Sequence, residues 1–376
     1  MKNLSRREFV KAASAATLAA AAIPSFAAPG RQRVFVASNT PDGILAFDWD
    51  PATAGLTPAG VAAKIDNVDW VILSANRQFL FAAAEVDSFN GKPTGEVASF
   101  AVHDGKLTPL SAQNSASTGT CHIALDHTGH VLLAADYFGG SAASFLVNDG
   151  KLSSLAWSEH YLEHGPDPVR QPTAHAHFAT VSPDNRSAYF NDLGGDSIHI
   201  YSLNAVTGIL TPAGIYRTKP ASGPRTLHFH PNGHSAYSIN EMAATVDVLE
   251  WNKSTGLLTM VTRIDLLPAD FKGGGHACDT VITKNGRFVY FTNREYDFIY
   301  GFKADTRTGA LAPIARFDCG GPIPRNFVLD PTARWMLVAN QNSDRISIFA
   351  RNPETGVLAP KGKSVAAAKP MCILFN

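Results

Sequence analysis

The stretch "LHFHPNGHSAYSINE" (Leu227–Glu241) consists of two short runs rich in apolar residues, joined by a Pro-Asn-Gly turn. The same arrangement returns in "HIALDHTGHVLLAADY" (His122–Tyr137), "VITKNGRFVYFTNRE" (Val281–Glu295) and "FVLDPTARWMLVANQ" (Phe327–Gln341). A run, a tight turn and a second run predict an antiparallel β-hairpin. The chain therefore repeats one hairpin many times.

A second signal, Gly-x-Leu, separates these hairpins. It occurs at Gly105, Gly150, Gly208, Gly256, Gly309 and Gly356, and in the shorter form Gly-Leu at Gly55, so that seven such glycines lie about 50 residues apart. Short strands repeated with this period are typical of propeller blades. We therefore predict an all-β fold, a seven-bladed β-propeller with four antiparallel strands per blade. A β-helix and two stacked sandwiches are the alternatives.

The two ends of the chain complement each other. The C-terminal "PMCILFN" is similar only to the first strand of a unit, whereas "RVFVASNT" near the N-terminus is similar only to the second. One blade is therefore predicted to contain strands from both termini, with the C-terminal strand innermost. Such pairing removes exposed strand edges and holds both ends of the chain.

The first residues are expected to be an export signal. "SRREFVK" (Ser5–Lys11) precedes an Ala-rich stretch that ends in a small-x-small pattern at Ala27, and it resembles a twin-arginine signal. We predict a signal peptide at 1–27, a propeller domain at 28–376, the twin-arginine export machinery as a partner and a periplasmic location without a membrane anchor after processing. A basic N-terminal helix or a membrane anchor is the alternative.

The composition favours a small-molecule ligand. Lys and Arg (32) balance Asp and Glu (32), so no charge excess points to nucleic acid or an anionic membrane. The four cysteines have no metal-ligand spacing, and they are expected to be buried thiols. No metal, nucleotide or Ser-nucleophile motif occurs, so we expect no cofactor and no metal.

Alignment of the units shows two columns of unusual residues. The first column opens the first strand of each unit and holds Asp69, Cys121, His177, Arg225, Cys278, Arg325 and Met371. The second column follows the second strand and holds Glu85, Tyr137, Leu193, Glu241, Arg294 and Gln341. Because the two strands pair in a hairpin, both columns should lie at the same end of every blade. Side chains that vary so widely suggest one asymmetric ligand.

The candidate catalytic residues are His177, Arg225, Glu241 and Arg294. The candidate substrate-binding residues are His175, Glu85, His122, Arg325 and Gln341. His175 lies two residues before His177 and is expected on the same face. In the alternative interpretation the arginines are ion-pair partners between blades, with Glu241 or Glu85 as counterions. "DLGGD" (Asp192–Asp196) is interpreted as a turn rather than a metal site.

Several motifs together resemble the seven-bladed lactonase family, which includes bacterial 6-phosphogluconolactonase and fungal carboxy-muconate lactonizing enzyme. They include "HAHF" at His177, "GPRT" at Arg225, "INE" at Glu241, "TNR" at Arg294 and the terminal "PMCILF". The resemblance implies these four residues as the site. Thr226, where the family usually has His, and Asp136, where it usually has Asn, are departures.

The resemblance implies a hydrolase that opens a sugar lactone, with His177 or Glu241 as general base and Arg225 and Arg294 stabilising the oxyanion. A muconate-type lactonizing cycloisomerase is the second possibility. The third possibility is a non-catalytic periplasmic propeller that binds a protein or a cell-wall component through the rim formed by these two columns of residues.

Overall fold

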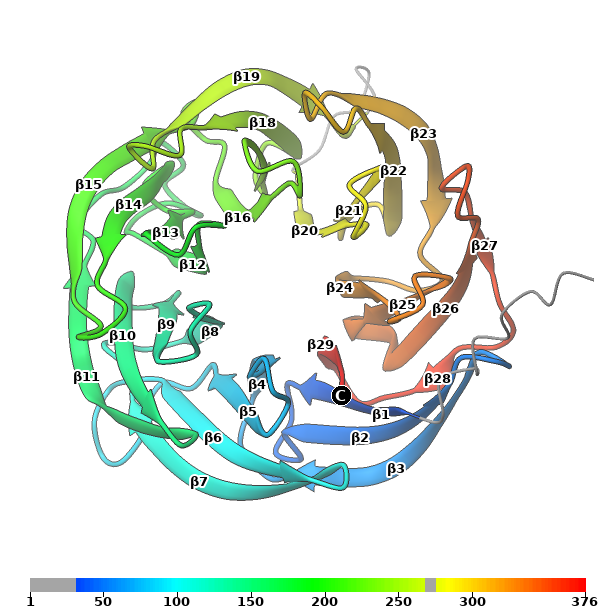
Figure 1. Cartoon of the computed structure of the whole chain (residues 1–376), viewed down its shortest axis with the longest axis horizontal. Helices are drawn as coiled ribbons and strands as arrows, with labels where there is room; N and C mark the ends of the chain where they lie inside the picture. Colours follow the sequence, from blue (N-terminus) through cyan, green and yellow to red (C-terminus); the bar gives the residue numbers. More distant parts are fainter. Residues whose placement is uncertain (1–31, 268–274) are drawn as a thin grey trace, which may run out of the picture. The chain divides into compact units, whose positions relative to one another are not determined.

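The computed structural model describes residues 32–267 and 275–376. The predicted signal peptide at 1–27 lies outside the described residues. In the described part, seven antiparallel sheets surround a central axis and confirm the predicted seven-bladed propeller (Figure 1). No helix among the described residues is long and apolar enough to span a bilayer.

Each blade has four strands, numbered here from the axis outward. Blades 1 to 4 are β29 (Pro370–Phe375), β1 (Gln32–Ser38), β2 (Ile44–Asp50), β3 (Gly55–Ala63); β4 (Val68–Leu73), β5 (Phe79–Ala84), β6 (Glu96–His103), β7 (Lys106–Asn114); β8 (Thr120–Leu125), β9 (Val131–Asp136), β10 (Ser141–Asn148), β11 (Lys151–His160); and β12 (Ala176–Val181), β13 (Ser187–Asp192), β14 (Ser197–Leu203), β15 (Leu210–Arg217).

Blades 5 to 7 follow the same order. They are β16 (Pro224–Phe229), β17 (Ser235–Asn240), β18 (Thr245–Trp251), β19 (Leu258–Asp265); β20 (Ala277–Ile282), β21 (Phe288–Asn293), β22 (Phe298–Ala304), β23 (Leu311–Asp318); and β24 (Pro324–Leu329), β25 (Trp335–Asn340), β26 (Arg345–Arg351), β27 (Leu358–Pro360). The short strand β28 (Val365–Ala366) also pairs with β26, and the 3-10 turn η1 spans Gln341–Ser343.

Blade 1 is closed by both ends of the chain, as predicted. The C-terminal strand β29 lies innermost and pairs with β1, from Val34 opposite Phe375 to Ser38 opposite Pro370. In Figure 1 the red C-terminal strand lies beside the blue β1. A core cluster that includes Val34, Leu337 and Ile373 fills the space between blades 7 and 1.

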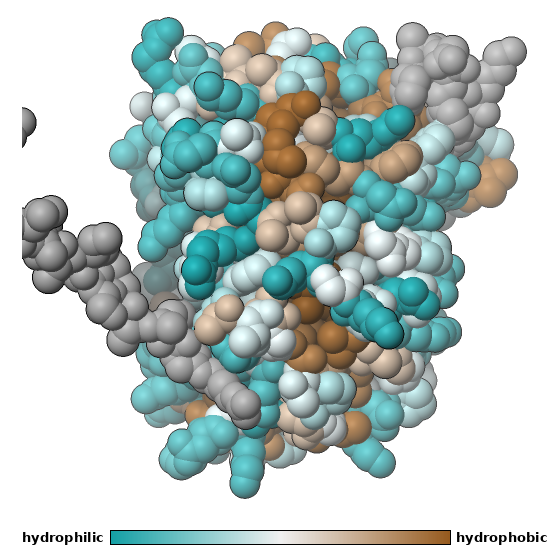
Figure 2. Space-filling model, turned by 90° about the vertical axis from the view of Figure 1, so that its right-hand side faces the viewer, coloured by the Kyte–Doolittle hydropathy of each residue, from teal (hydrophilic) through white to brown (hydrophobic). Residues whose placement is uncertain are grey.

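The hydrophobic core lies between the blades. Seven clusters of buried side chains fill the seven blade-to-blade interfaces, and each contains apolar residues from two neighbouring sheets. The outermost strands are more exposed; β23, for example, contains partly buried and exposed residues but no fully buried one. On the outer face in Figure 2, apolar side chains form separate groups among polar ones.

The Gly-x-Leu signal has a structural cause. Its glycine lies in the turn between the third and fourth strands, with φ of 76° at Gly256, 73° at Gly309 and 75° at Gly356, a region that favours glycine. The carbonyl of Gly309 accepts a 2.7 Å hydrogen bond from the hydroxyl of Tyr237 in the preceding blade. Gly256 and Gly356 receive the same bond from Tyr189 and Tyr290. The repeat signal therefore marks a connection between neighbouring blades.

Candidate active site

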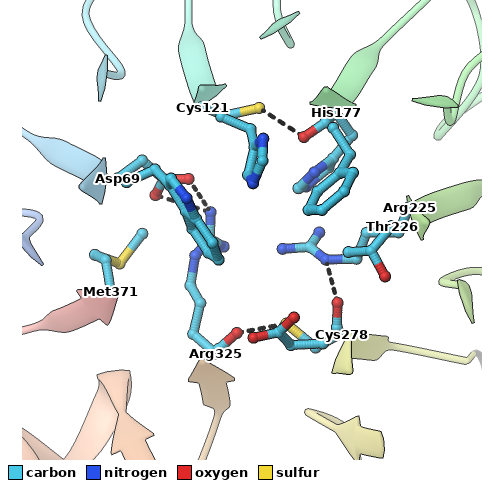
Figure 3. A pocket seen from close by; sticks show the side chains of 12 residues that line it. Asp69, Cys121, His177, Arg225, Thr226, Cys278, Arg325 and Met371 are labelled. Carbon is cyan, nitrogen blue, oxygen red and sulfur yellow. Dashed lines mark hydrogen bonds and ion pairs between the residues drawn. The ribbon is translucent and has the colours of Figure 1, made fainter. Parts of the chain in front are cut away.

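The first column of residues lines the central channel. Each of its seven members is the second residue of an innermost strand, and all seven line one pocket: Asp69, Cys121, His177, Arg225, Cys278, Arg325 and Met371 (Figure 3). The strand register shifts at each of these positions; His177, for instance, lies between Ala176, opposite Asp192, and Phe178, opposite Asn191. Such β-bulges redirect a side chain. The repeated bulge explains why this column faces the axis.

The second column lies at the same end of the propeller, as predicted. Its residues directly follow the second strands, and their backbone N–H groups bond the carbonyls of the segments that lead into the first strands. Examples are Glu241 to Gly223, at 2.7 Å, and Arg294 to His276, at 2.9 Å. Water can enter only about 20 Å³ between the channel side chains, room for about one molecule. A larger ligand does not fit between these side chains, so the space beside the second column is the place for one.

Glu241 is the electrostatic centre of the site. Its carboxylate, only 2% exposed, accepts hydrogen bonds from Arg225 and, at 2.6 Å, from Arg170, and lies 2.8 Å from Nη2 of Arg294. Burial alone would raise the pKa of Glu241, but the guanidinium groups of Arg294 and Arg225 hold it well below its usual range. Glu241 is therefore an anion that fixes three cations in place.

His177 is a buried, neutral imidazole. Burial lowers its pKa well below the usual value, and the nearby charge of Arg225 lowers it further. Its Nδ1 atom is buried without a hydrogen-bond partner among the described residues. The Sγ atom of Cys121 lies 3.4 Å from the carbonyl oxygen of His177 and helps to fix the backbone there. A neutral imidazole nitrogen without a partner can accept a proton.

The two arginines are oriented by different contacts. Nε of Arg225 donates to the carbonyl of Cys278 at 2.9 Å, which points the guanidinium toward the axis (Figure 3). Nε of Arg294 is buried and has no partner within the described ranges. Because an unpaired buried donor is costly, this atom is suited to a ligand oxygen.

On the opposite side of the channel, Arg325 pairs with Asp69. Nη2 of Arg325 donates to both carboxylate oxygens of Asp69 at 3.0 Å. Burial, with a contribution from the charge of Asp69, raises the pKa of Glu85 to about 7. The alternative interpretation is thus partly correct, since the arginines do form ion pairs, with Glu241 and Asp69 as the counterions.

The remaining predicted residues have other surroundings. His175 is not among the residues that line the narrow part of the channel, whereas His177 is. The ring of His175 stacks on Tyr137 with centroids 4.5 Å apart, and its Nδ1 lies 2.9 Å from the Tyr137 carbonyl. The ring of His177 meets the same Tyr137 ring edge-on at 5.4 Å. His122 does line the channel, but its ring packs between Trp70 and Phe178, and its Nδ1 accepts the N–H of Ala179.

Gln341 begins the turn η1 at the same end of the propeller and is half-buried. "DLGGD" forms the turn between β13 and β14, as expected. All four cysteines are buried free thiols. Thr226, one of the two departures, lines the channel, and its hydroxyl has no partner in the described part of the chain.

Sequence reasoning missed Arg170. This residue lies in the connection between β11 and β12, residues 161–175, which is longer than the other connections between blades, so no aligned column contains it. It bonds Glu241, and its Nη1 lies 3.5 Å from Nε2 of His276. The signal in the sequence was an arginine in this long connection.

The fold is thus a β-propeller that gathers Arg225, Arg294 and Arg325 at one end of its central channel. The chain belongs to the family described as lactonase, 7-bladed beta-propeller, which it matches over residues 33–375.

Individual relatives support this assignment. The chain is 31% identical to a 6-phosphogluconolactonase of Bacillus subtilis over 89% of its own length and 94% of the relative. It is 29% identical to a 6-phosphogluconolactonase of Cronobacter sakazakii, over 92% and 98% of the two chains. Its fold matches the structure of a periplasmic gluconolactonase of Pseudomonas aeruginosa with a TM-score of 0.87 and 28% identity, covering 92% and 99%.

Proposed function

We propose that this protein hydrolyses sugar lactones at the rim formed by His177, Arg225, Glu241 and Arg294. One observation carries the proposal. The neutral imidazole of His177, whose Nδ1 has no partner among the described residues, lies in the same site as two guanidinium groups that the Glu241 carboxylate holds in place. Ester hydrolysis needs this combination, a base for water and fixed positive charge for the oxyanion. The relatives named as lactonases support the same reaction class.

In the proposed mechanism His177 is the general base. It removes a proton from water as the water oxygen bonds to the lactone carbonyl carbon, and the carbonyl oxygen becomes an oxyanion. The ring C–O bond then breaks, the leaving alkoxide takes a proton from His177, and the acid product loses its proton to solvent. Glu241 is the weaker candidate, because its carboxylate already contacts Arg225, Arg170 and Arg294, whereas Nδ1 of His177 has no partner among the described residues.

Arg225 and Arg294 stabilise the oxyanion. Arginine remains charged and presents a planar fork of donors, so it needs no reorganisation as the negative charge develops. Glu241 neutralises part of their charge and fixes their positions. With Arg170 and Arg325 the rim holds four arginines, which suits a substrate that becomes an anion on ring opening.

We further propose that the substrate is an unphosphorylated aldonolactone in the periplasm. Two observations support this: the N-terminal stretch resembles a twin-arginine signal, and one relative is named a periplasmic gluconolactonase. Fractionation of cells tests the location, with cleavage after Ala27 as the expected processing. Glucono-δ-lactone and its 6-phosphate, compared with the purified mature chain, test the substrate; preference for the phosphate contradicts this part.

The test of the reaction is acid release from a panel of lactones, measured at constant pH. His177→Gln should lower kcat by about 10²–10⁴-fold, the usual contribution of a general base. His103→Gln is the matched control, because His103 is 89% exposed and lies on the outer part of blade 2. Loss of diene absorbance with a muconate, without lactone hydrolysis, would favour the cycloisomerase. No turnover of either substrate would favour the binding protein.

A further inference from the structure

Three potential metal ligands meet in blade 4, outside the channel-lining layer. Glu163 follows β11, Asp192 ends β13 and His199 lies in β14. One ligand atom from each lies within 4.8 Å of the others; Nε2 of His199 is 3.8 Å from Glu163 Oε2 and 3.9 Å from Asp192 Oδ2. We propose that this cluster binds a divalent transition-metal ion of the zinc class.

The buried carboxylate of Asp192 is the strongest argument. Its side chain is fully buried, and one oxygen accepts the backbone N–H of His175 at 2.7 Å. The other oxygen, Oδ2, has no hydrogen-bond partner among the described residues, although it faces His199. An unpaired buried carboxylate oxygen is expensive, and a bound cation removes that cost.

Gly195 leaves room beside this oxygen. A Cβ atom at Gly195 would lie 2.3 Å from Asp192 Oδ2 and 2.9 Å from Cβ of Glu163. The backbone of Gly195 does not have a positive φ, so close approach, not backbone freedom, explains the glycine here. The turn thus keeps the space at the carboxylate open.

The other ligands are already oriented. The His199 ring stacks on Tyr161 with centroids 3.8 Å apart and an angle of 5°. The hydroxyl of Ser197 lies 3.1 Å from both His199 Nε2 and Glu163 Oε2. Its oxygen can therefore serve as the fourth ligand. Imidazole nitrogen and carboxylate oxygens bind zinc at about 2.0–2.2 Å in a tetrahedral arrangement. Ligand atoms of such a site lie about 3.4 Å apart, so His199 Nε2 has to approach each of the two carboxylate oxygens by only about 0.5 Å.

One existing interaction competes with the ion. Arg217 donates to both carboxylate oxygens of Glu163, at 2.8 and 3.3 Å, and its side chain is 59% exposed. An exposed ion pair of this kind contributes little to stability, so a cation can displace it. The bound ion would then hold the loop between β11 and β12, which carries Arg170, to blade 4.

The experiment measures zinc binding by the untagged mature protein after treatment with a chelator. We expect one equivalent of zinc to remain after gel filtration, and a melting temperature about 4 °C higher at a zinc concentration one hundred times the Kd. Asp192→Asn and His199→Gln should weaken binding at least 100-fold. Asp192→Asn keeps an oxygen for the His175 N–H, and Glu163→Gln is a third variant if either of these does not fold.

His103→Gln is the control, because it removes a histidine beside a carboxylate, Asp104, at an exposed position. It should bind zinc as the wild type does. The proposal is overturned if the wild type retains no zinc, or if Asp192→Asn and His199→Gln retain as much as the control. Tighter binding of Ca²⁺ than of Zn²⁺ would also overturn it, because Ca²⁺ prefers oxygen ligands and would not use His199.

Discussion

Replacing Glu241 by Gln tests whether one carboxylate holds the rim together. The substitution keeps the size of the side chain but removes the charge from a group that contacts Arg170, Arg225 and Arg294. Removing one partner of a buried ion pair costs about 3–5 kcal/mol. For a domain of this length the unfolding entropy corresponds to about 0.7 kcal/mol per degree, so the melting temperature should fall by about 4–7 °C.

The matched control is Glu354→Gln. Glu354 also pairs with an arginine, Arg287, at 3.2 Å, but its side chain is 75% exposed, so the melting temperature should change by less than about 1 °C. The double variant Glu241→Gln/Arg294→Gln should be more stable than Glu241→Gln alone, because it also removes one uncompensated cation. Calorimetry of the wild type, the two single variants and the double variant gives the four melting temperatures. If Glu241→Gln and Glu354→Gln have the same melting temperature, Glu241 is not what holds the guanidinium groups in place.

Three further results are expected. Because burial keeps the pKa of His177 well below its ordinary value, kcat/KM should stay constant from pH 7 to below 6; an acid limb near pH 6.5 would argue against His177 as the base. With its pKa raised to about 7, Glu85 holds a proton in the folded state that the unfolded chain loses near pH 4.5. The contribution of Glu85 to the free energy of unfolding should therefore fall, by at most about 3 kcal/mol, as the pH rises from 4.5 to about 7. Urea titrations of the wild type should show this fall, and those of Glu85→Gln should not. Deleting residues 370–376 removes the innermost strand of blade 1 and should abolish cooperative melting; an unchanged transition would mean that the ring does not need this strand.

The ring and its rim could be predicted because the repeat places equivalent residues at equivalent points. A column found by alignment became a layer of side chains around the axis, since the same bulge occurs in every innermost strand. The bulge also bears on His175, which does not line the narrow part of the channel although His177 does. Residues two positions apart point the same way only in a regular strand, and the register is irregular at His177.

Glu241 was predicted as a counterion of the arginines, but two other partners could not be predicted. Arg325 pairs with Asp69, which is 256 residues away in the chain, and Arg170 enters from the long connection between β11 and β12. Such pairings depend on the curvature of the ring and on one loop conformation, and neither leaves a periodic pattern. Likewise, His199 joins Asp192 and Glu163 only because a strand, a turn and a loop meet in space.

The innermost strand of blade 1, β29, comes after every other strand of the propeller in the sequence. The sheet that contains β1 therefore cannot be completed until Pro370–Phe375 has been synthesised. Until then the inner edge of β1 offers unpaired backbone groups to any other strand. Any export route that carries this domain in folded form therefore has to wait until all seven blades have been made.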